Sequence, residues 1–182
     1  MKKIALVLAL VLSMSCLAAC GSTTPETTAP AETTPAVAAP AGTTAELIDG
    51  IYSNVTVELA LVTETTEGAL ADAEMFTYLT TIESMEGIVD ASVSMPMMGS
   101  QAYHLALVRA ESAEKAAEVA QFMFDNMDMA RWVCVQATEK QAVVCGDLAL
   151  FIMLDPQYGT TSDQIVEAFT TVCGGAVDTV IK

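Results

Sequence analysis

The sequence predicts an α+β domain over residues 44–182, in which helices cover a mostly antiparallel sheet of about four strands to make two layers. Two observations lead to this expectation. Apolar runs arrive as adjacent pairs separated by short breaks, which is typical of antiparallel hairpins. Between the pairs, apolar residues recur at three- and four-residue spacing, which favours helices. The 139 residues of this segment fit one domain of ordinary size.

The first part of the domain is predicted to contain two helices. Thr44 suits the N-cap of a helix over 45–54, because its hydroxyl can accept a hydrogen bond from the first turn. Residues 55–62 alternate weakly and fit a short strand or a loop. A second helix is predicted over 68–85, ended by Gly87. The apolar residues that predict it are Met75, Leu79, Ile82 and Met85.

Two strands and a long helix are predicted next. The strands cover 88–95 and 103–110, and proline and glycine break the apolar pattern between them, at 95–100. Ser112 is the expected N-cap of a helix over 113–133. The expected buried side of this helix consists of Ala116, Ala120, Met123, Met127, Ala130 and Cys134.

A second hairpin and a last helix complete the predicted domain. Apolar runs at 141–145 and 148–154 are joined by a Gly-Asp pair at 146–147, which is typical of a tight turn. Thr161, with a glutamine three residues later, forms a capping box for a helix that runs to about Cys173. A pair of glycines follows and ends this helix.

The N-terminal residues resemble the leader of a bacterial lipoprotein. Residues 1–19 combine two lysines with an apolar run that stops at Cys20, as a secretory signal peptide does. Residues 17–20, Leu-Ala-Ala-Cys, resemble a lipobox, which implies cleavage before Cys20 and a lipid on its sulfur. Two or more acyl chains anchor a protein stably, so we expect it on the extracytoplasmic face of the cell membrane. An ordinary signal peptide or an uncleaved anchor is the alternative.

The segment 20–43 is expected to tether the domain to this lipid. Prolines recur every fifth residue among threonine and alanine, at Pro25, Pro30, Pro35 and Pro40. Such a composition buries too little apolar surface to offset the entropy of ordering. Residues 21–43 would reach roughly 70 Å if fully extended.

The net charge of the chain limits the kinds of partner that it can bind. The precursor has 7 basic and 23 acidic residues, and the leader removes two lysines and no acid, so the mature net charge is −18. This charge repels nucleic acid and anionic lipid head groups, so we expect no nucleic-acid partner. Basic peptides, an envelope protein or cations remain as partners, and a purely solubilising role of the charge is the alternative.

The segment 93–112, VSMPMMGSQAYHLALVRAES, and more weakly residues 72–79, are markers of a wider resemblance. Through them the chain resembles a family of bacterial lipoproteins that carry a domain of unknown function. Family members often carry an acidic side chain near the position of His104 and a more charged long helix. The resemblance implies the envelope location and the α+β fold, and it brings no catalytic residues and no cofactor.

The residues themselves indicate a protein that is not an enzyme. The chain has one histidine, His104, and strand alternation places it outward, in solvent, if Tyr103 and Leu105 point inward. Nucleophile elbows, phosphate-binding loops, dinucleotide fingerprints and zinc-protease motifs are missing from the sequence. The first hypothesis is therefore a non-enzymatic binding domain at the envelope, without a cofactor.

A copper-handling protein is the second hypothesis. Met95, Met97 and Met98 cluster in one break, and thioethers suit cuprous copper, with His104 able to complete the set. Methionine is also a common filler of apolar cores, which is the simpler interpretation of the cluster.

Three cysteines remain in the predicted domain: Cys134, Cys145 and Cys173. Outside the cell a disulfide can persist, and any of the three pairings would leave one free thiol. All three equally suit small buried side chains, and the spacing excludes a C-x-x-C motif.

Overall fold

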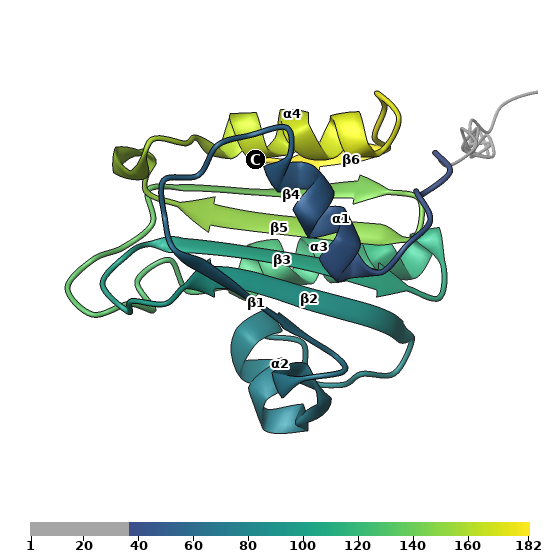
Figure 1. The fold of residues 1–182 in the computed structure, drawn as a ribbon. Coiled ribbons are helices and arrows are strands. Elements are labelled where there is room, and N and C mark those ends of the chain that lie inside the picture. Colours follow the sequence, from purple (N-terminus) through teal and green to yellow (C-terminus); the bar gives the residue numbers. More distant parts are fainter. Residues whose placement is uncertain (1–36) are drawn as a thin grey trace, which may run out of the picture. The chain divides into compact units, whose positions relative to one another are not determined.

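The computed structural model describes residues 37–182 (Figure 1). The predicted signal peptide at 1–19, the lipid site at Cys20 and most of the expected tether lie outside the described residues. No helix in the part that is described has the length and apolarity needed to cross a membrane.

One antiparallel sheet of six strands forms the centre of the domain. Its strands are β1 (Leu61–Thr65), β2 (Ile88–Pro96), β3 (Tyr103–Ala110), β4 (Glu139–Cys145), β5 (Leu148–Leu154) and β6 (Thr179–Ile181). They lie in the order β1-β2-β3-β5-β4-β6, and every neighbouring pair is antiparallel. The expected α+β class with an antiparallel sheet is therefore confirmed. The two edge strands, β1 and β6, add to the four central strands that the sequence predicts.

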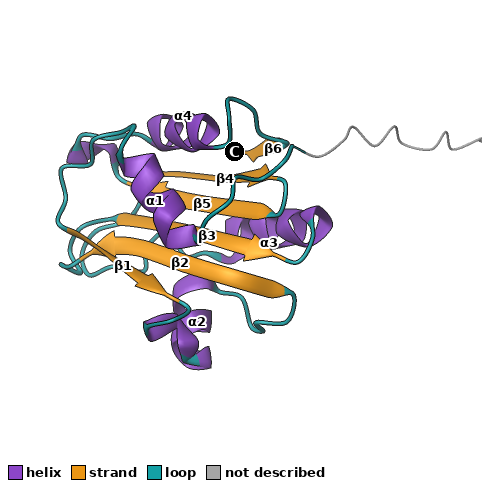
Figure 2. Ribbon diagram, turned by 45° about the vertical axis from the view of Figure 1, so that its right-hand side comes forward, coloured by secondary structure: helices purple, strands orange, loops and turns teal. Residues whose placement is uncertain are grey.

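Helices cover both faces of this sheet, so the domain has three layers rather than the two expected (Figures 1 and 2). The four α-helices are α1 (Thr44–Tyr52), α2 (Ala73–Thr80), α3 (Ala113–Asn126) and α4 (Ser162–Val172). One apolar core joins α1 and α4 to the sheet, and a second joins α2 and α3 to the opposite face. All seven residues of β5 are buried, because both of its faces are covered.

The predicted helix over 68–85 is wrong in its length. A short 3₁₀ turn, Ala69–Ala71, precedes α2, and Asp72 starts α2 by accepting from the backbone N–H of Met75 at 2.9 Å. Thr81 takes a left-handed conformation, with φ of 63°, and stops the helix after eight residues. Met75, one of the apolar residues whose spacing predicts the helix, is 40% exposed, whereas Phe76 and Leu79 face the core.

The long helix α3 also ends earlier than the predicted 113–133. Ser112 caps it as expected, by accepting from the N–H of Lys115 at 3.2 Å. Met127 is buried but extended, which ends the helix after Asn126. The expected buried positions of Ala130 and Cys134 are therefore wrong, since both follow the helix and Cys134 is exposed.

Two other local predictions are confirmed by the structure, and a third differs by one residue. Gly146, with φ of 55°, turns the hairpin between β4 and β5. Thr161 and Gln164 form the capping box of α4. At α1 the N-cap is Thr43, one residue before the predicted Thr44, because Thr44 instead faces the sheet and is buried.

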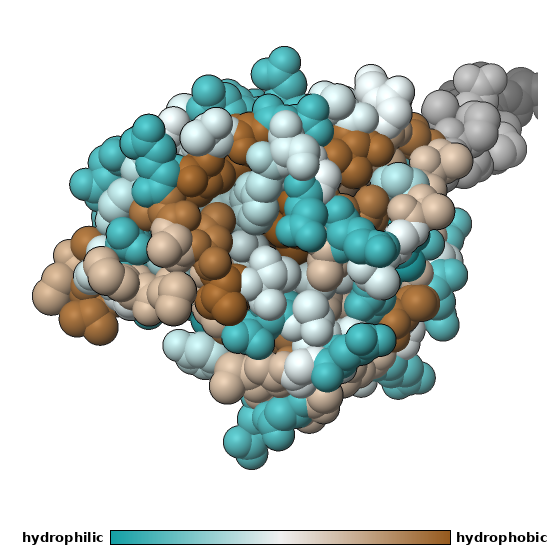
Figure 3. Space-filling view, viewed as in Figure 1, coloured by the Kyte–Doolittle hydropathy of each residue, from teal (hydrophilic) through white to brown (hydrophobic). Residues whose placement is uncertain are grey.

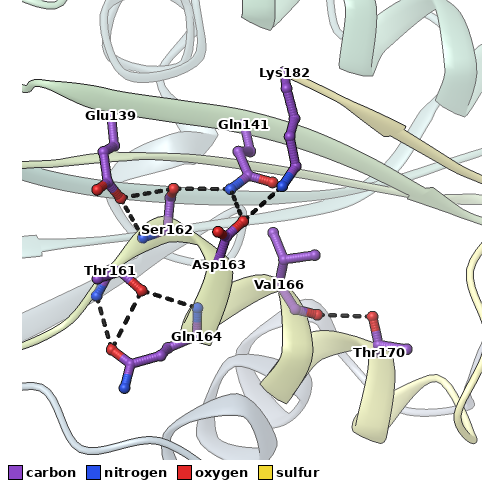
Figure 4. Close-up of polar contacts among 9 residues, drawn as sticks. All are labelled: Glu139, Gln141, Thr161, Ser162, Asp163, Gln164, Val166, Thr170 and Lys182. Atoms are coloured by element: carbon purple, nitrogen blue, oxygen red, sulfur yellow. Dashed lines mark hydrogen bonds and ion pairs between the residues drawn. The ribbon is translucent and has the colours of Figure 1, made fainter.

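A polar network fixes the start of α4 on the sheet (Figure 4). Glu139 accepts from both the backbone N–H and the hydroxyl of Ser162, each at 2.8 Å. Gln141 donates to Ser162 at 2.8 Å and to Asp163 at 2.6 Å, and Lys182 pairs with Asp163 at 2.7 Å. The network therefore joins α4, β4 and the C-terminal residue.

Residues 37–43, which the sequence assigns to the tether, lie against the domain. The backbone N–H of Val37 donates to Asp178 at 2.7 Å, and Arg109 donates to the carbonyl of Pro40 at 2.7 Å. Asp178 also accepts from the N–H of Gly146 at 2.6 Å. The described chain thus enters the domain beside the β4–β5 turn.

Candidate functional site

His104 is buried on the face of the sheet that α2 and α3 cover. Its neighbours Tyr103 and Leu105 belong to the core on the other face, as strand alternation requires. His104 is only 2% exposed, and its Nε2 lies 2.9 Å from the carbonyl oxygen of Leu79 in α2. The expectation of a solvated imidazole is wrong, because the sheet has no solvent-facing side at this position.

The surroundings of His104 keep its side chain neutral. Burial lowers the pKa of His104 to about 3, and the charge of Arg131 acts in the same direction, against the opposing effect of the Leu79 carbonyl. Because a carbonyl can only accept, Nε2 carries the proton and Nδ1 keeps its lone pair. A histidine in this state is a poor general base, but its lone pair suits a soft metal ion.

A cavity of about 240 Å³ brings His104 together with two of the predicted methionines. We call it the Met/His pocket, and its main lining residues are Met95, Met98, His104, Tyr78, Arg131 and Trp132. Met97 is 75% exposed and does not line it. The pocket therefore unites Met95, Met98 and His104 and leaves out Met97.

Arg131 places a positive charge in the wall of the Met/His pocket. Its Nη2 donates to the Tyr78 carbonyl at 2.8 Å, and its Nη1 lies 3.0 Å from the sulfur of Met127. The guanidinium also sits over the Tyr78 ring, 4.9 Å from its centre. These contacts hold the segment after α3 against α2, and the charge opposes a cation in the pocket.

A second hollow, of about 410 Å³, lies between α3 and the segment that leads from α2 to β2. Acidic side chains surround it, and only one cation, Lys115, is among its lining residues. We call it the acidic groove; its carboxylates are Glu83, Glu86, Glu111 and Glu118, and its apolar floor is Ile82, Val119 and Phe122. The acidic groove shares no lining residue with the Met/His pocket.

The shape of the acidic groove depends on Gly87. Gly87 has φ of 75°, a left-handed conformation that glycine adopts without strain, and it turns the chain into β2. A Cβ at this position would lie 3.3 Å from both Glu111 and Lys115. Lys115 also pairs with Glu118 at 3.5 Å, across one turn of α3.

The three cysteines of the domain are free thiols with different surroundings. Cys134 is exposed and left-handed, with φ of 63°. Cys145 and Cys173 are buried in the core beneath α1 and α4, and each thiol affects the pKa of the other. Burial is the main cause that raises the pKa of both. Residues far apart in sequence thus form one thiol pair.

A polar cluster between α1 and β2 is structural. Asp90 accepts from the backbone N–H of Thr44 at 2.7 Å and from the hydroxyl of Thr66 at 2.8 Å. Burial alone would raise the pKa of Asp90, but these hydrogen bonds outweigh it and lower that pKa. Thr44 also bonds Ser92, so its hydroxyl is used within the fold.

The sequence indicates part of these sites and not the rest. It points to Met95, Met98 and His104 by residue type, but it offers no sign of Arg131, which the early end of α3 brings to the pocket. The carboxylates of the acidic groove are spread over 83–118 and become a group only when α3 packs beside α2. Among residues 37–182, no three His, Cys, Asp or Glu side chains gather in a way that would hold a metal ion.

Comparison with known proteins finds no relative. No protein-family model matches the chain, and neither the curated proteins nor the solved structures contain a significant match. The function must therefore be argued from the geometry of the two hollows.

Proposed function

We propose that this protein is a lipoprotein anchored through Cys20 on the extracytoplasmic face of the cell membrane, and that its domain binds a cationic, amphipathic segment in the acidic groove. The segment belongs to a basic peptide or to another envelope protein. The observation that carries the proposal is the arrangement of four glutamates and one lysine around an apolar floor. We propose no enzymatic activity.

Both parts of the acidic groove contribute to such binding. Apolar side chains of the partner would cover Ile82, Val119 and Phe122, and Phe122 is 40% exposed without a partner. The groove has the size of a small ligand pocket. Cationic side chains beside them would pair with the glutamates, and the charge of the whole chain would speed the encounter.

Fluorescence anisotropy with a labelled leucine–lysine amphipathic peptide tests this function. The protein is the mature chain, residues 20–182, carrying Cys20→Ala, which lacks both the apolar leader and the lipid and therefore needs no detergent. We expect saturable binding that weakens as salt is added, and none with a peptide in which glutamate replaces lysine.

Substitutions in the groove locate the site. Glu86→Gln with Glu111→Gln should weaken binding about two- to thirtyfold, because each of the two exposed ion pairs contributes about 0.2–1 kcal/mol. The matched control is Glu167→Gln, an exposed glutamate of α4 that lies outside the acidic groove. Equal affinity in the double variant and the unsubstituted chain would reject the groove as the site.

Binding of cuprous copper in the Met/His pocket is the second candidate, and one observation favours it. The pocket unites the thioethers of Met95 and Met98 with a neutral His104 whose Nε2–H is bonded to a carbonyl. Histidine ligands in metal sites commonly have such a partner on the other ring nitrogen. The charge of Arg131 in the same wall makes this the weaker candidate.

Competition between the protein and a chromogenic cuprous chelator tests whether the Met/His pocket binds cuprous copper. A copper site predicts removal of about one equivalent of copper from the chelator, and Met98→Leu should abolish that removal. Met97→Leu is the matched control, because Met97 is a neighbour in sequence that does not line the pocket. If the protein takes no copper from the chelator, the copper candidate is excluded.

A further inference from the structure

Two cysteines that are 28 positions apart in sequence meet in one core. Cys145 is the last residue of β4, and Cys173 is the C-cap of α4. Both belong to the apolar core between the sheet and the α1/α4 layer, and each thiol affects the pKa of the other. The carbonyl of Val144, next to Cys145, accepts from the backbone N–H of Asp178, five residues after Cys173, at 2.8 Å. The fold therefore brings the two cysteines close together in this core.

The third cysteine lies at the other end of the sheet. The backbone N–H of Val133, next to Cys134, donates to the carbonyl of Gly99, in the loop that precedes β3. That loop lies where β3 begins and β5 ends, opposite the β4–β5 turn that follows Cys145. The seven residues of β4 span about 20 Å between these ends. Since the Cα atoms of a disulfide lie within about 7 Å, Cys134 cannot reach Cys145 in this fold.

A short strand and the hydrogen bonds of Asp178 hold the C-terminal segment beside these two cysteines. β6 has three residues and pairs only with β4. Asp178, just before β6, accepts from the backbone N–H groups of Val37 and Gly146 at 2.7 and 2.6 Å. A covalent link from α4 to β4 would therefore stabilise the place where three separate segments of the chain meet.

We propose that Cys145 and Cys173 form a disulfide in the mature protein, which links α4 to β4, and that Cys134 stays a free thiol. The inference rests on the extracytoplasmic location proposed above, where disulfides persist. The oxidant is a disulfide-bearing protein or a small disulfide compound of the envelope. One cysteine thiolate attacks the oxidant's disulfide and releases one oxidant thiol. The second cysteine thiolate then attacks the mixed disulfide and displaces the other oxidant thiol. In total, two electrons and two protons pass to the oxidant.

Burial determines when this bond forms and how long it lasts. In the closed fold the raised pKa of both thiols leaves little thiolate, which is the reactive form. Oxidation therefore precedes the closure of α4 over the sheet. Once formed, the disulfide is shielded from thiols in solution.

The positions of lysine and arginine make a direct test simple. Trypsin releases residues 132–140 with Cys134, and residues 141–182 with both Cys145 and Cys173. The full-length protein is isolated from the bacterial envelope, unfolded without reductant, alkylated with iodoacetamide, digested and weighed. We expect one label on 132–140, and an unlabelled 141–182 that takes up two labels after reduction. Two labels on 141–182 before reduction, or a cross-link between the peptides, would overturn the proposal.

A second measurement separates a wrong pairing from a wrong location. The purified full chain is reduced, unfolded and refolded with oxidised glutathione. If envelope protein is labelled twice but this sample forms the internal bond, the proposed location has failed; if neither forms it, the pairing itself has failed. Reduction of the disulfide should lower the melting temperature by on the order of 10 °C in the unsubstituted chain and in Cys134→Ala. Reduction should leave the melting temperature of Cys173→Ala unchanged, because that variant cannot form the bond.

Discussion

Acidification should destabilise this protein through one side chain, His104. In the unfolded chain the imidazole titrates at its ordinary pKa of 6.5, whereas in the fold its pKa is about 3. Protons therefore bind the unfolded state more readily, so the stability from the neutral imidazole is complete above pH 6.5 and is lost as the pH falls from 6.5 towards 3. At pH 5 the loss is the free energy of 1.5 pH units, or about 2 kcal/mol.

Urea unfolding at pH 7.5 and at pH 5.0 measures this loss. The chain contains one histidine, so no second imidazole contributes over this interval. The Asp90 carboxyl, with its lowered pKa, affects stability only at lower pH, because its stabilising contribution is lost as the pH falls below the ordinary carboxyl range. The matched variant is His104→Gln, which retains an N–H donor for the Leu79 carbonyl without titrating.

The expected result is a free energy of unfolding about 2 kcal/mol lower at pH 5.0 in the unsubstituted chain, and nearly equal values at both pH values in His104→Gln. The variant's own stability at pH 7.5 does not affect this comparison, because each chain is compared with itself. The same pH dependence in both chains would refute the reasoning, since it would mean that the imidazole is protonated inside the fold or titrates normally.

Three further predictions concern the groove, α4 and the anchor. Gly87→Ala should lower the free energy of unfolding by about 1–2 kcal/mol, because alanine is strained at φ of 75°, whereas Gly99→Ala, with open space around its Cβ, should change it little; urea midpoints measure both. Glu139→Ala should cost about 1 kcal/mol in the same assay, because Ser162 loses the acceptor of its N–H and hydroxyl. The N-terminal peptide of the mature protein should begin at Cys20 and carry two or more acyl chains, and a native peptide that begins upstream of Cys20 or has no acyl mass in mass spectrometry would contradict lipid anchoring.

The central part of the fold was predictable because its signals are local. The Gly-Asp pair at 146–147 and the cap at Ser112 act over a few residues, so their positions agree with the structure. The number of layers was harder to predict from the sequence. The runs LALVRA in β3 and LALFIML in β5 do not alternate, a pattern that indicates cover on both faces, whereas the solvent position predicted for His104 requires one open face.

The errors in helix length have a different cause. Apolar spacing continues past Thr80 and past Asn126, so periodicity alone extends both helices. The structure stops α2 with a left-handed threonine, a conformation that sequence patterns seldom reveal. The position of Arg131 depends on tertiary contacts. Because α3 ends before it, Arg131 can reach α2 and line the Met/His pocket.

The docking of residues 37–43 beside the β4–β5 turn gives the domain two unlike poles. Glu111 of the acidic groove follows directly after β3 at the pole where the chain enters, and the loop at Gly99 is at the other pole. For a protein held by lipid, tension along the chain would draw the entry pole towards the bilayer. The acidic groove would then lie on the side of the domain that faces the lipid head groups, and the loop at Gly99 would point away from them.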